Sequence, residues 1–413
     1  MALLERLLAG RITRGTLTIH RPGGIIKLGN PAAGWPDIVM HVHSAAAERR
    51  IMTNPKLGLG EAFMDGSISV NDEDIMGLVS LVRGNNIWEK GGQLKPPSSV
   101  KRMMTMLMRP FQQLNSLANS RSNVAHHYDL SNDFYRQWLD EDMQYSCAYW
   151  ADGVETLEQA QLAKKAHIAA KLALQPGQRV LDIGCGWGGM AMYLNRTCSV
   201  DVLGITLSEE QLKLARCRAD AAGVSHRVKF ELIDYRDLAK REAQGFDRIV
   251  SVGMFEHVGV PQFGTFFRAA SNLMTDDGVM LLHTIGRMGI PGATDAFTRK
   301  YIFPGGYIPA LSETLAASEK VKLIHSDVEN LRLHYAKTLR AWYARVQSIR
   351  DDVSTQYDEK FYRMWIFYLA GATAAFESGG MCNYQIQYIR ARGNIPLTRD
   401  YMAQTEAALL KQK

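Results

Sequence analysis

The sequence lacks the long apolar runs of membrane-spanning and exported proteins. A transmembrane helix needs about 18–20 consecutive apolar residues. The most apolar late stretch, residues 365–376, is shorter and is interrupted by Gly371 and Thr373. The first ten residues carry Glu5 and Arg6 among their leucines, so we expect no signal peptide. These absences predict a cytoplasmic protein.

Cysteine is also scarce. The five cysteines are odd in number, and no two of them have CxxC spacing; they are Cys147, Cys185, Cys198, Cys217 and Cys382. Disulfide frameworks and zinc sites need cysteines in even numbers or at close, regular spacing. We therefore predict neither a disulfide framework nor a metal site.

Acidic residues are absent from residues 91–123. The basic residues of this stretch are Lys95, Lys101, Arg102, Arg109 and Arg121. Residues 1–123 contain 15 Lys/Arg and 9 Asp/Glu, an excess equal to the net charge of +6 of the whole chain. The stretch begins with glycine and proline signals of a linker. Its charge suits an anionic partner, either nucleic acid or a lipid surface, but a solvated linker has the same composition.

No internal repeat or low-complexity segment is found, and the hydrophobic pattern divides the chain. Residues 1–90 alternate short β-like runs with turns. Strands are expected at residues 15–20 and 37–42, a helix at 43–52, and glycine-rich turns at 57–60 and 65–66. This pattern predicts a small α+β domain.

From residue 124 onward, helical and strand patterns alternate. Strands are expected at residues 179–183, 200–205, 228–233, 247–252 and 278–285, with helices at 157–174, 208–222 and from 188. Strands separated by helix-length segments predict βαβ units in a doubly wound, mostly parallel sheet. Residues 124–413 are therefore predicted to form a Rossmann-like α/β catalytic domain, with its ligands at the carboxyl ends of the strands.

A glycine-rich loop follows the first of these strands. Gly184, Gly186 and Gly188 alternate in it, and Asp182 lies two residues before the first glycine. Glycine lets the backbone turn tightly and approach a ligand closely. A nicotinamide-binding loop would instead read GxGxxG, with an acid at the end of the second strand. The loop therefore suits a nucleoside joined to a zwitterionic amino acid better than a pyrophosphate.

The next two strand ends extend this predicted nucleoside site. Many methyltransferases place an acid at the end of the second strand, whereas this chain has Thr206 and Leu207, a form found in one methyltransferase branch. The third strand is followed by Asp234 and Tyr235. We expect Asp234 or the adjacent backbone near the adenine amino group, with Tyr235 beside the adenine face.

Seven ordered motifs carry a family resemblance. They are residues 127–133, 143–150, 180–189, 253–258, 281–285, 301–306 and 334–339. In these motifs, from His126 to about Arg392, the chain resembles cyclopropane fatty acid synthases and the related mycolic acid cyclopropane synthases. Residues 1–90 look like the amino-terminal domain of the bacterial phospholipid-acting branch. The resemblance implies a class I methyltransferase fold that uses S-adenosylmethionine (SAM).

The resemblance also implies a set of site residues. SAM contacts are expected from Tyr145, Ser146, Asp182, Gly184, Gly186, Thr206, Leu207, Gln211, Asp234, Tyr235 and Arg236. Bicarbonate, the general base in the family, is expected at Cys147, Glu256, His283, Ile285 and Tyr335. Cys147 and Ile285 would contribute mainly backbone groups, and Tyr128 and Phe303 match positions near the reacting carbon.

The implied reaction adds a methylene group from SAM to cis double bonds of phospholipid acyl chains. Methyl transfer to an alkene creates a carbocation, which aromatic faces stabilise. The expected partners are an anionic phospholipid bilayer and a second copy of the chain. Residues 1–90 would associate with lipid or dimerise, and the enzyme would bind reversibly to the inner face of the membrane. We expect no nucleic acid, because no helix-turn-helix or related motif is present.

Three alternatives remain open at this point. The chain could methylate acyl chains without ring closure, giving methyl-branched or methylene products. It could be a small-molecule N-methyltransferase, since some plant alkaloid enzymes share this scaffold. It could also be a non-catalytic lipid-binding or nucleic-acid-binding protein, although the intact glycine loop argues against this.

Overall fold

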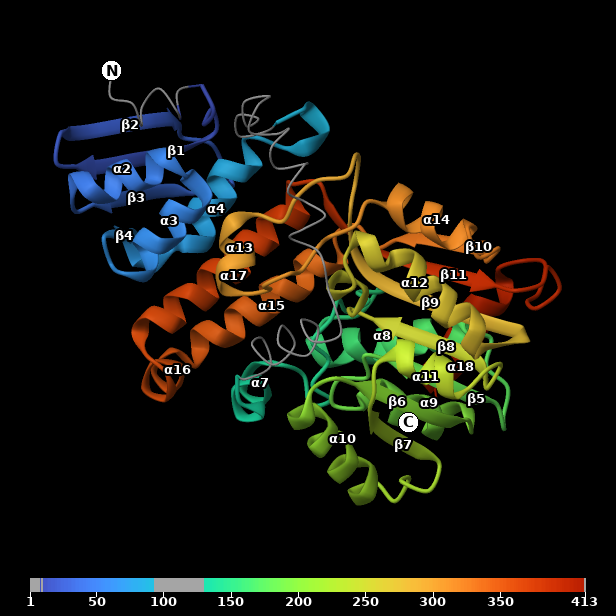
Figure 1. Ribbon diagram of the computed structural model, residues 1–413. Helices are drawn as coiled ribbons and strands as arrows, with labels where there is room; N and C mark the ends of the chain where they lie inside the picture. Colours follow the sequence, from blue (N-terminus) through green and yellow to red (C-terminus); the bar gives the residue numbers. More distant parts are fainter. Residues whose placement is uncertain (1–7, 9, 93–129, 412–413) are drawn as a thin grey trace. The chain divides into compact units, whose positions relative to one another are not determined.

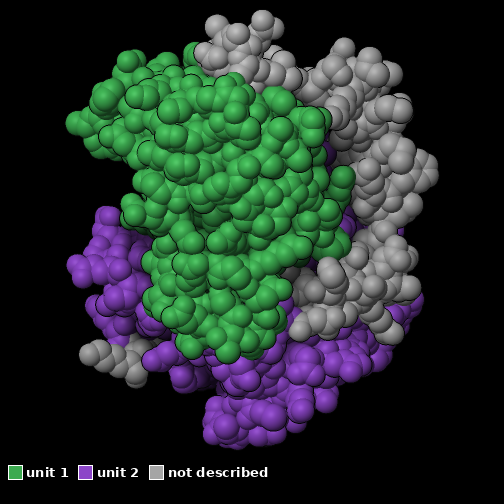
Figure 2. All heavy atoms as spheres, turned by 90° about the vertical axis from the view of Figure 1, so that its left-hand side faces the viewer, with its two compact units in different colours: residues 1–103, 294–304, 336–381 green, residues 104–293, 305–335, 382–413 purple. Residues whose placement is uncertain are grey.

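The computed structural model describes residue 8, residues 10–92 and residues 130–411. These residues form two compact units, coloured separately in Figure 2. Among them, unit 1 takes the residues before 93 together with 294–304 and 336–381, and unit 2 takes the rest. Almost all of the predicted basic linker lies outside the described residues. The roles predicted for residues 1–90 and 124–413 stay predictions.

Unit 1 contains a four-stranded sheet in the order β2-β1-β3-β4 (Figure 1). Its strands are β1 (Gly15–Arg21), β2 (Gly24–Asn30), β3 (Asp37–Val42) and β4 (Ile68–Val70). β1 pairs antiparallel with β2 and parallel with β3, and β3 pairs antiparallel with β4. In β1 the side chains of Leu17 and Ile19 are buried while their neighbours are partly exposed, the alternation of a half-buried strand. The two strands predicted in this region are confirmed, whereas β2 and β4 were not predicted.

The glycine-rich turn predicted at residues 57–60 is wrong. These residues lie inside helix α3 (Pro55–Met64), which follows α2 (Ala45–Thr53). A Cβ atom at Gly58 would approach the Arg50 carbonyl oxygen to 2.2 Å, and one at Gly60 would approach the Phe297 ring to 2.6 Å. The glycines therefore permit close packing of this helix, and that packing overrides their weak helix propensity.

The remaining helices of unit 1 come from distant parts of the sequence. They are α4 (Ile75–Gly84), α13 (Ala296–Tyr301), most of α15 (His334–Ser348), α16 (Arg350–Gln356) and α17 (Glu359–Glu377), with 3₁₀ turns at Asn71–Glu73 and Trp88–Lys90. α17 packs against α3 and α4, and Phe367 contacts the rings of Phe63 and Phe297. No helix in the described part of the chain is long and apolar enough to cross a membrane.

Unit 2 contains a seven-stranded sheet in the order β10-β11-β9-β8-β5-β6-β7 (Figure 1). The strands are β5 (Arg179–Ile183), β6 (Asp201–Thr206), β7 (Val228–Leu232), β8 (Phe246–Val252), β9 (Met274–Arg287), β10 (Ile324–Asn330) and β11 (Met381–Ile389). Neighbours from β7 through β5 to β9 pair parallel, and β10 pairs antiparallel with β11. The predicted α/β fold is confirmed, although β10 and β11 were not predicted.

Helices cover both faces of this sheet. They are α7 (Asn132–Trp138), α8 (Leu157–Lys171), α9 (Gly189–Cys198), α10 (Glu209–Ala221), α11 (Tyr235–Arg241), α12 (Phe263–Leu273), α14 (Leu311–Glu319) and α18 (Asp400–Lys411), with 3₁₀ turns at Phe255–His257 and Val260–Gln262. Val180 of β5 packs in one core with α8 and α9, while Leu181 and Ile183 pack in the other with α11 and α12. Because successive strand residues point to opposite faces, this division confirms the doubly wound arrangement.

Candidate active site

A pocket of about 1150 Å³, counting its open mouth, lies within unit 2 at the carboxyl ends of β5, β6, β7 and β8. This is where ligands of open α/β sheets bind. Every predicted cofactor residue lines it: Tyr145, Ser146, Asp182, Gly184, Gly186, Thr206, Leu207, Gln211, Asp234, Tyr235 and Arg236. The structure therefore brings the whole predicted set into one cavity. Their individual contacts with the cofactor remain predictions.

The glycine loop supplies a bare wall of this pocket. Gly184 and Gly186 have φ angles of +82° and +54°, in the left-handed region that glycine adopts most easily. A Cβ atom at Gly184 would also approach the Met254 side chain to 2.8 Å. The backbone nitrogens of Gly184 and Cys185 both donate to the Ile205 carbonyl, at 2.9 and 3.0 Å, which ties the loop to β6.

Asp182 provides an unsatisfied buried carboxylate beside this loop. Its side chain is 2% exposed, and its Oδ2 has no hydrogen-bond partner among the described residues. Burial raises the pKa of Asp182 to about 7, against the opposing charge of Lys164. A buried polar atom without a partner is costly, so a ligand cation fits here. The α-ammonium group of SAM is such a cation, and the glycine loop leaves room for its nucleoside.

The loop after β7 is held by its own side chains. The carboxylate of Asp234 accepts hydrogen bonds from the Arg236 backbone nitrogen at 2.8 Å and from its guanidinium at 2.7 and 2.8 Å. Tyr235 is largely buried and lies edge-on to Phe266, with ring centroids 5.3 Å apart. Arg236 takes two bonds on Oδ1 and one on Oδ2, so Oδ2 and the adjacent backbone both remain candidates for an adenine contact.

Three of the residues predicted to bind an anion lie together at the end of β8 and β9. Glu256 lies on the 3₁₀ turn after β8, and its Oε1 accepts a hydrogen bond of 2.5 Å from the Ile285 backbone nitrogen. His283 precedes Ile285 by two residues in β9, so both side chains point to the same face. Glu256 Oε2 and His283 Nε2 are buried and have no hydrogen-bond partner within residues 130–411.

The protonation of this pair follows from its burial. Burial raises the pKa of Glu256 to about 7, although the hydrogen bond from Ile285 lowers it. Burial lowers the pKa of His283 to about 3, and the nearby positive charge of Lys164 lowers it further. His283 is therefore neutral near pH 7, while Glu256 readily carries a proton. A neutral imidazole and a protonated carboxyl can both donate a hydrogen bond to an anion.

The remaining predicted catalytic residues have different outcomes. Cys147 is buried, and burial raises the pKa of its thiol far above the ordinary value, so the thiol is inert as a nucleophile. Tyr335 is buried near the start of α15. Tyr128 lies outside the described residues. Phe303 belongs to unit 1, where its ring lies edge-on to Tyr368.

Two buried residues of the site were missed by the sequence analysis. The Gln385 amide on β11 donates to His283 Nδ1 at 3.1 Å, and both side chains are at most 1% exposed. Asn383 lies two residues earlier and opposes the effect of burial on the pKa of the Cys147 thiol. Asn383, Gln385 and Gln387 alternate in this strand and are all buried. This alternation was the available signal, but β11 itself was not predicted.

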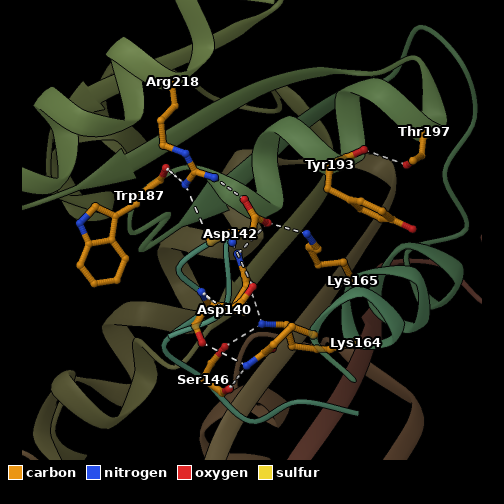
Figure 3. A network of polar contacts seen from close by, with 11 residues as sticks. Asp140, Asp142, Ser146, Lys164, Lys165, Trp187, Tyr193, Thr197 and Arg218 are labelled. Atoms are coloured by element: carbon orange, nitrogen blue, oxygen red, sulfur yellow. Dashed lines mark hydrogen bonds and ion pairs between the residues drawn. The ribbon is translucent and has the colours of Figure 1, made fainter. Parts of the chain in front are cut away.

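Lys164 of α8 was missed as well. Its Nζ donates to Gln144 Oε1 at 2.6 Å and to Ser146 Oγ at 2.9 Å, and both partners line the pocket (Figure 3). A lysine on the inner face of an amphipathic helix was the available signal, since lysine is almost never fully buried without a partner.

Comparison with known proteins identifies the family. Residues 115–386, more than half of the chain, match the family described as mycolic acid cyclopropane synthetase. The chain belongs to this family. The cyclopropane-fatty-acyl-phospholipid synthase of Escherichia coli (strain K12) is 37% identical over 84% of this chain and 86% of that protein. The tuberculostearic acid methyltransferase of Mycobacterium tuberculosis is 34% identical over 94% of this chain and 92% of that protein.

A solved structure of a mycolic acid cyclopropane synthase has the same fold. A mycolic acid cyclopropane synthase complexed with SAH and CTAB superposes with a TM-score of 0.60 and 34% identity, over 65% of this chain and 97% of that chain. As a member of the family, the chain is a SAM-dependent methyltransferase with a class I fold. The predictions of family, fold and enzyme class are confirmed.

Proposed function

We propose that the chain transfers a methylene group from SAM to a cis double bond in an unsaturated phospholipid acyl chain, forming a cyclopropane ring. The similarity to the E. coli synthase over most of both chains supports this substrate class. The structural observation that carries the proposal is the buried pair of Glu256 and His283 at the end of the sheet that also bears the cofactor pocket.

SAM and bicarbonate would have different roles in the reaction. When bound, SAM supplies the methyl carbon, and bicarbonate supplies the base that removes one proton from it, so that the ring closes through a carbocation. The residues of this chain fit a small anion, because Glu256 Oε2 and His283 Nε2 are buried and lack partners in the described structure. Unsatisfied buried polar groups cost about 1–3 kcal/mol each, and an anion bound to both would remove this cost.

The chain's own residues hold and shield these groups. Glu256 and His283 would donate to the anion, with Tyr335 and the backbone at Cys147 completing its surroundings. The Ile285 backbone nitrogen donates to Glu256 Oε1 and would hold that carboxyl in place. The inert Cys147 thiol adds no competing nucleophile. Phe303 would present an aromatic face to the cation, a contact worth about 0.5–2 kcal/mol.

The second candidate function is acyl-chain methylation without ring closure. The observation that favours it is the similarity to the tuberculostearic acid methyltransferase, which spans 94% of this chain. Both reactions begin with methyl transfer from SAM to an acyl chain, so the cofactor pocket does not distinguish them. They differ in whether the added methyl group then loses a proton to close the ring.

The base assignment is tested by paired assays of binding and turnover. Glu256→Ala and His283→Ala should lose most turnover and keep wild-type SAM affinity, because both side chains would hold the anion rather than the nucleoside. Removing bicarbonate from the assay should slow the wild-type enzyme. His325→Ala is a control, since His325 bonds Ser318 at 2.7 Å and is not among the pocket residues. Full activity in a rigorously bicarbonate-free assay would refute the role of the anion.

The proposal includes reversible binding of the enzyme to the membrane surface, because the acyl chain must leave a bilayer to reach the pocket. The basic residues between 91 and 123 would attract an anionic leaflet, each contributing about 1 kcal/mol of binding free energy. Changing Lys101, Arg102 and Arg109 to Gln should reduce sedimentation with anionic vesicles at low salt. Unchanged binding would leave residues 1–90 as the candidate, either for lipid association or for the expected homodimer.

A further inference from the structure

A buried lysine lies directly behind the cofactor pocket. Lys164 is fully buried in α8, and its two hydrogen-bond acceptors, Gln144 Oε1 and Ser146 Oγ, belong to a segment that lines the pocket (Figure 3). The neighbouring helix residue Gln161 holds the backbone of the same segment, donating to the carbonyls of Gln144 and Ser146 at 3.1 and 3.0 Å. The backbone and the side chains of this wall therefore have separate anchors.

The lysine fixes the direction of the Ser146 hydroxyl proton. An ammonium group has three donors and no acceptor, whereas a hydroxyl has one donor and two lone pairs. Ser146 Oγ must accept the bond from Lys164, so its own proton points elsewhere. Because Ser146 lines the pocket, its hydroxyl is available to donate to an acceptor on a bound ligand.

The two carboxylates near Lys164 also have other hydrogen-bond partners. Asp142 is already bonded to Lys165 at 2.5 Å and to the Arg218 guanidinium (Figure 3). The Asp140 carboxylate accepts backbone hydrogen bonds from residues 142 and 144, at 3.2 and 2.8 Å. The other groups that Lys164 influences electrostatically are Cys147, Asp182 and His283.

We propose that Lys164 is a positioning residue for the cofactor, which turns the Ser146 hydroxyl into a donor for the carboxylate of the SAM amino acid moiety. Asp182, with its unpaired oxygen, then faces the ammonium of the same moiety. The pocket thus presents opposite charges to the two ends of a zwitterion. This inference rests on the assignment of the pocket as the SAM site.

The effect is titratable. Burial lowers the pKa of Lys164 to about 8, although Asp140 and Asp142 oppose this shift. Above that pH the Lys164 amine is neutral and carries no charge. It then no longer forces the Ser146 hydroxyl to accept its hydrogen bond. The α-amino group of SAM also loses its proton, at about pH 7.7–8.0. The ratio of two dissociation constants measured with the same ligand cancels that second titration. It does not cancel the titration of Asp182, whose pKa of about 7 is lowered by Lys164, so the comparison is repeated in an Asp182→Asn background.

The experiment measures SAM affinity by calorimetry from about pH 6.5 to pH 9.5, a range that brackets both titrations. Lys164→Met should raise the dissociation constant roughly tenfold near pH 7, the size of a charged hydrogen bond. Its ratio to wild type should fall toward one as the pH rises past about 9. Lys165→Met removes the adjacent cation without touching Ser146 and should change affinity little. Gln161→Met removes the neutral anchor and should give a ratio that does not vary with pH.

A double-mutant cycle tests the route through Ser146. If Lys164 acts through this hydroxyl, Lys164→Met should add little further loss in a Ser146→Ala background. A wild-type affinity in folded Lys164→Met, a pH-independent ratio, or an equal loss in Lys165→Met would each overturn the inference. If Lys164→Met does not fold, Ser146→Ala decides instead, since its ratio to wild type should show the same fall with pH. Absence of SAM binding by the wild-type protein would contradict the pocket assignment itself.

Discussion

The side-chain amide of Gln385 donates a 3.1 Å hydrogen bond to Nδ1 of the buried His283. Because an amide nitrogen only donates, Nδ1 accepts, and the proton of the neutral imidazole lies on Nε2. That Nε2 is the buried atom left without a partner in the described structure. Gln385 therefore fixes the tautomer in which His283 can donate to an anion.

Replacing Gln385 with Met should lower turnover roughly tenfold, about the value of one hydrogen bond, and leave SAM affinity near wild type. The imidazole would then be free to adopt the wrong tautomer. Gln387→Met is the matched control, because Gln387 lies two residues further along β11 and bonds Tyr401 and the Lys171 carbonyl instead. Equal losses of turnover in both variants, or no loss in Gln385→Met, would contradict the role of Gln385.

Gly186→Val should abolish measurable SAM binding. The substitution strains a residue with φ of +54° and directs a branched side chain into the ligand's space. Gly223→Val imposes a comparable strain at φ of +69°, but Gly223 does not line the pocket, so that variant should retain affinity. A folded Gly186→Val protein that binds SAM as tightly as wild type would sink the cofactor assignment.

Glu256→Gln should stabilise the protein at high pH more than at low pH. The folded-state pKa of Glu256 is raised to about 7, so its contribution to stability is lost as the pH rises from about 4.5 through 7. The free energy of unfolding of Glu256→Gln relative to wild type should therefore increase by roughly 2–3 kcal/mol between about pH 5 and pH 8. Urea unfolding at several pH values measures this difference.

Glu329→Gln provides a control of opposite sign. Despite partial burial, the pKa of Glu329 is lowered by its hydrogen bond to His167 and by Lys171, so its contribution is present above about pH 4.5. This variant should lose stability at pH 8. A Glu256→Gln difference that stays flat from pH 5 to pH 8 would show that burial does not perturb Glu256.

Phe303→Ala should lower the rate and yield hydroxylated or branched by-products, because a less shielded cation can be trapped by water. Phe297→Ala is the control: Phe297 lies in the preceding helix α13 and packs on Phe367, so its loss should reduce stability without changing the products. Product analysis by mass spectrometry distinguishes the two. A clean cyclopropane product at the wild-type rate would remove Phe303 from the mechanism.

The sequence predicted the parts of the fold and site that depend on local patterns. β5 is a short buried strand followed by glycines at fixed spacing, and both its bounds and its role at the pocket could be read directly. The role of Gln385 could not be predicted, because it depends on β11 lying beside β9, and Gln385 is 102 residues from His283 in the sequence. Lys164 was missed for a similar reason, since only the folded helix brings it to Ser146. The α3 glycines were misread because close packing, of Gly58 against the Arg50 backbone and of Gly60 against Phe297, outweighs their weak helix propensity.

Analysis of the reaction products shows whether a cyclopropane ring forms. Vesicles of unsaturated phospholipid would be incubated with the protein and SAM carrying a deuterated methyl group, and the acyl chains analysed by mass spectrometry and proton NMR. We expect a gain of one methylene that has lost a single deuterium, together with loss of the alkene protons and appearance of ring protons. Retention of every methyl deuterium, persistence of the alkene protons in the modified chains, or no modification at all would contradict this expectation.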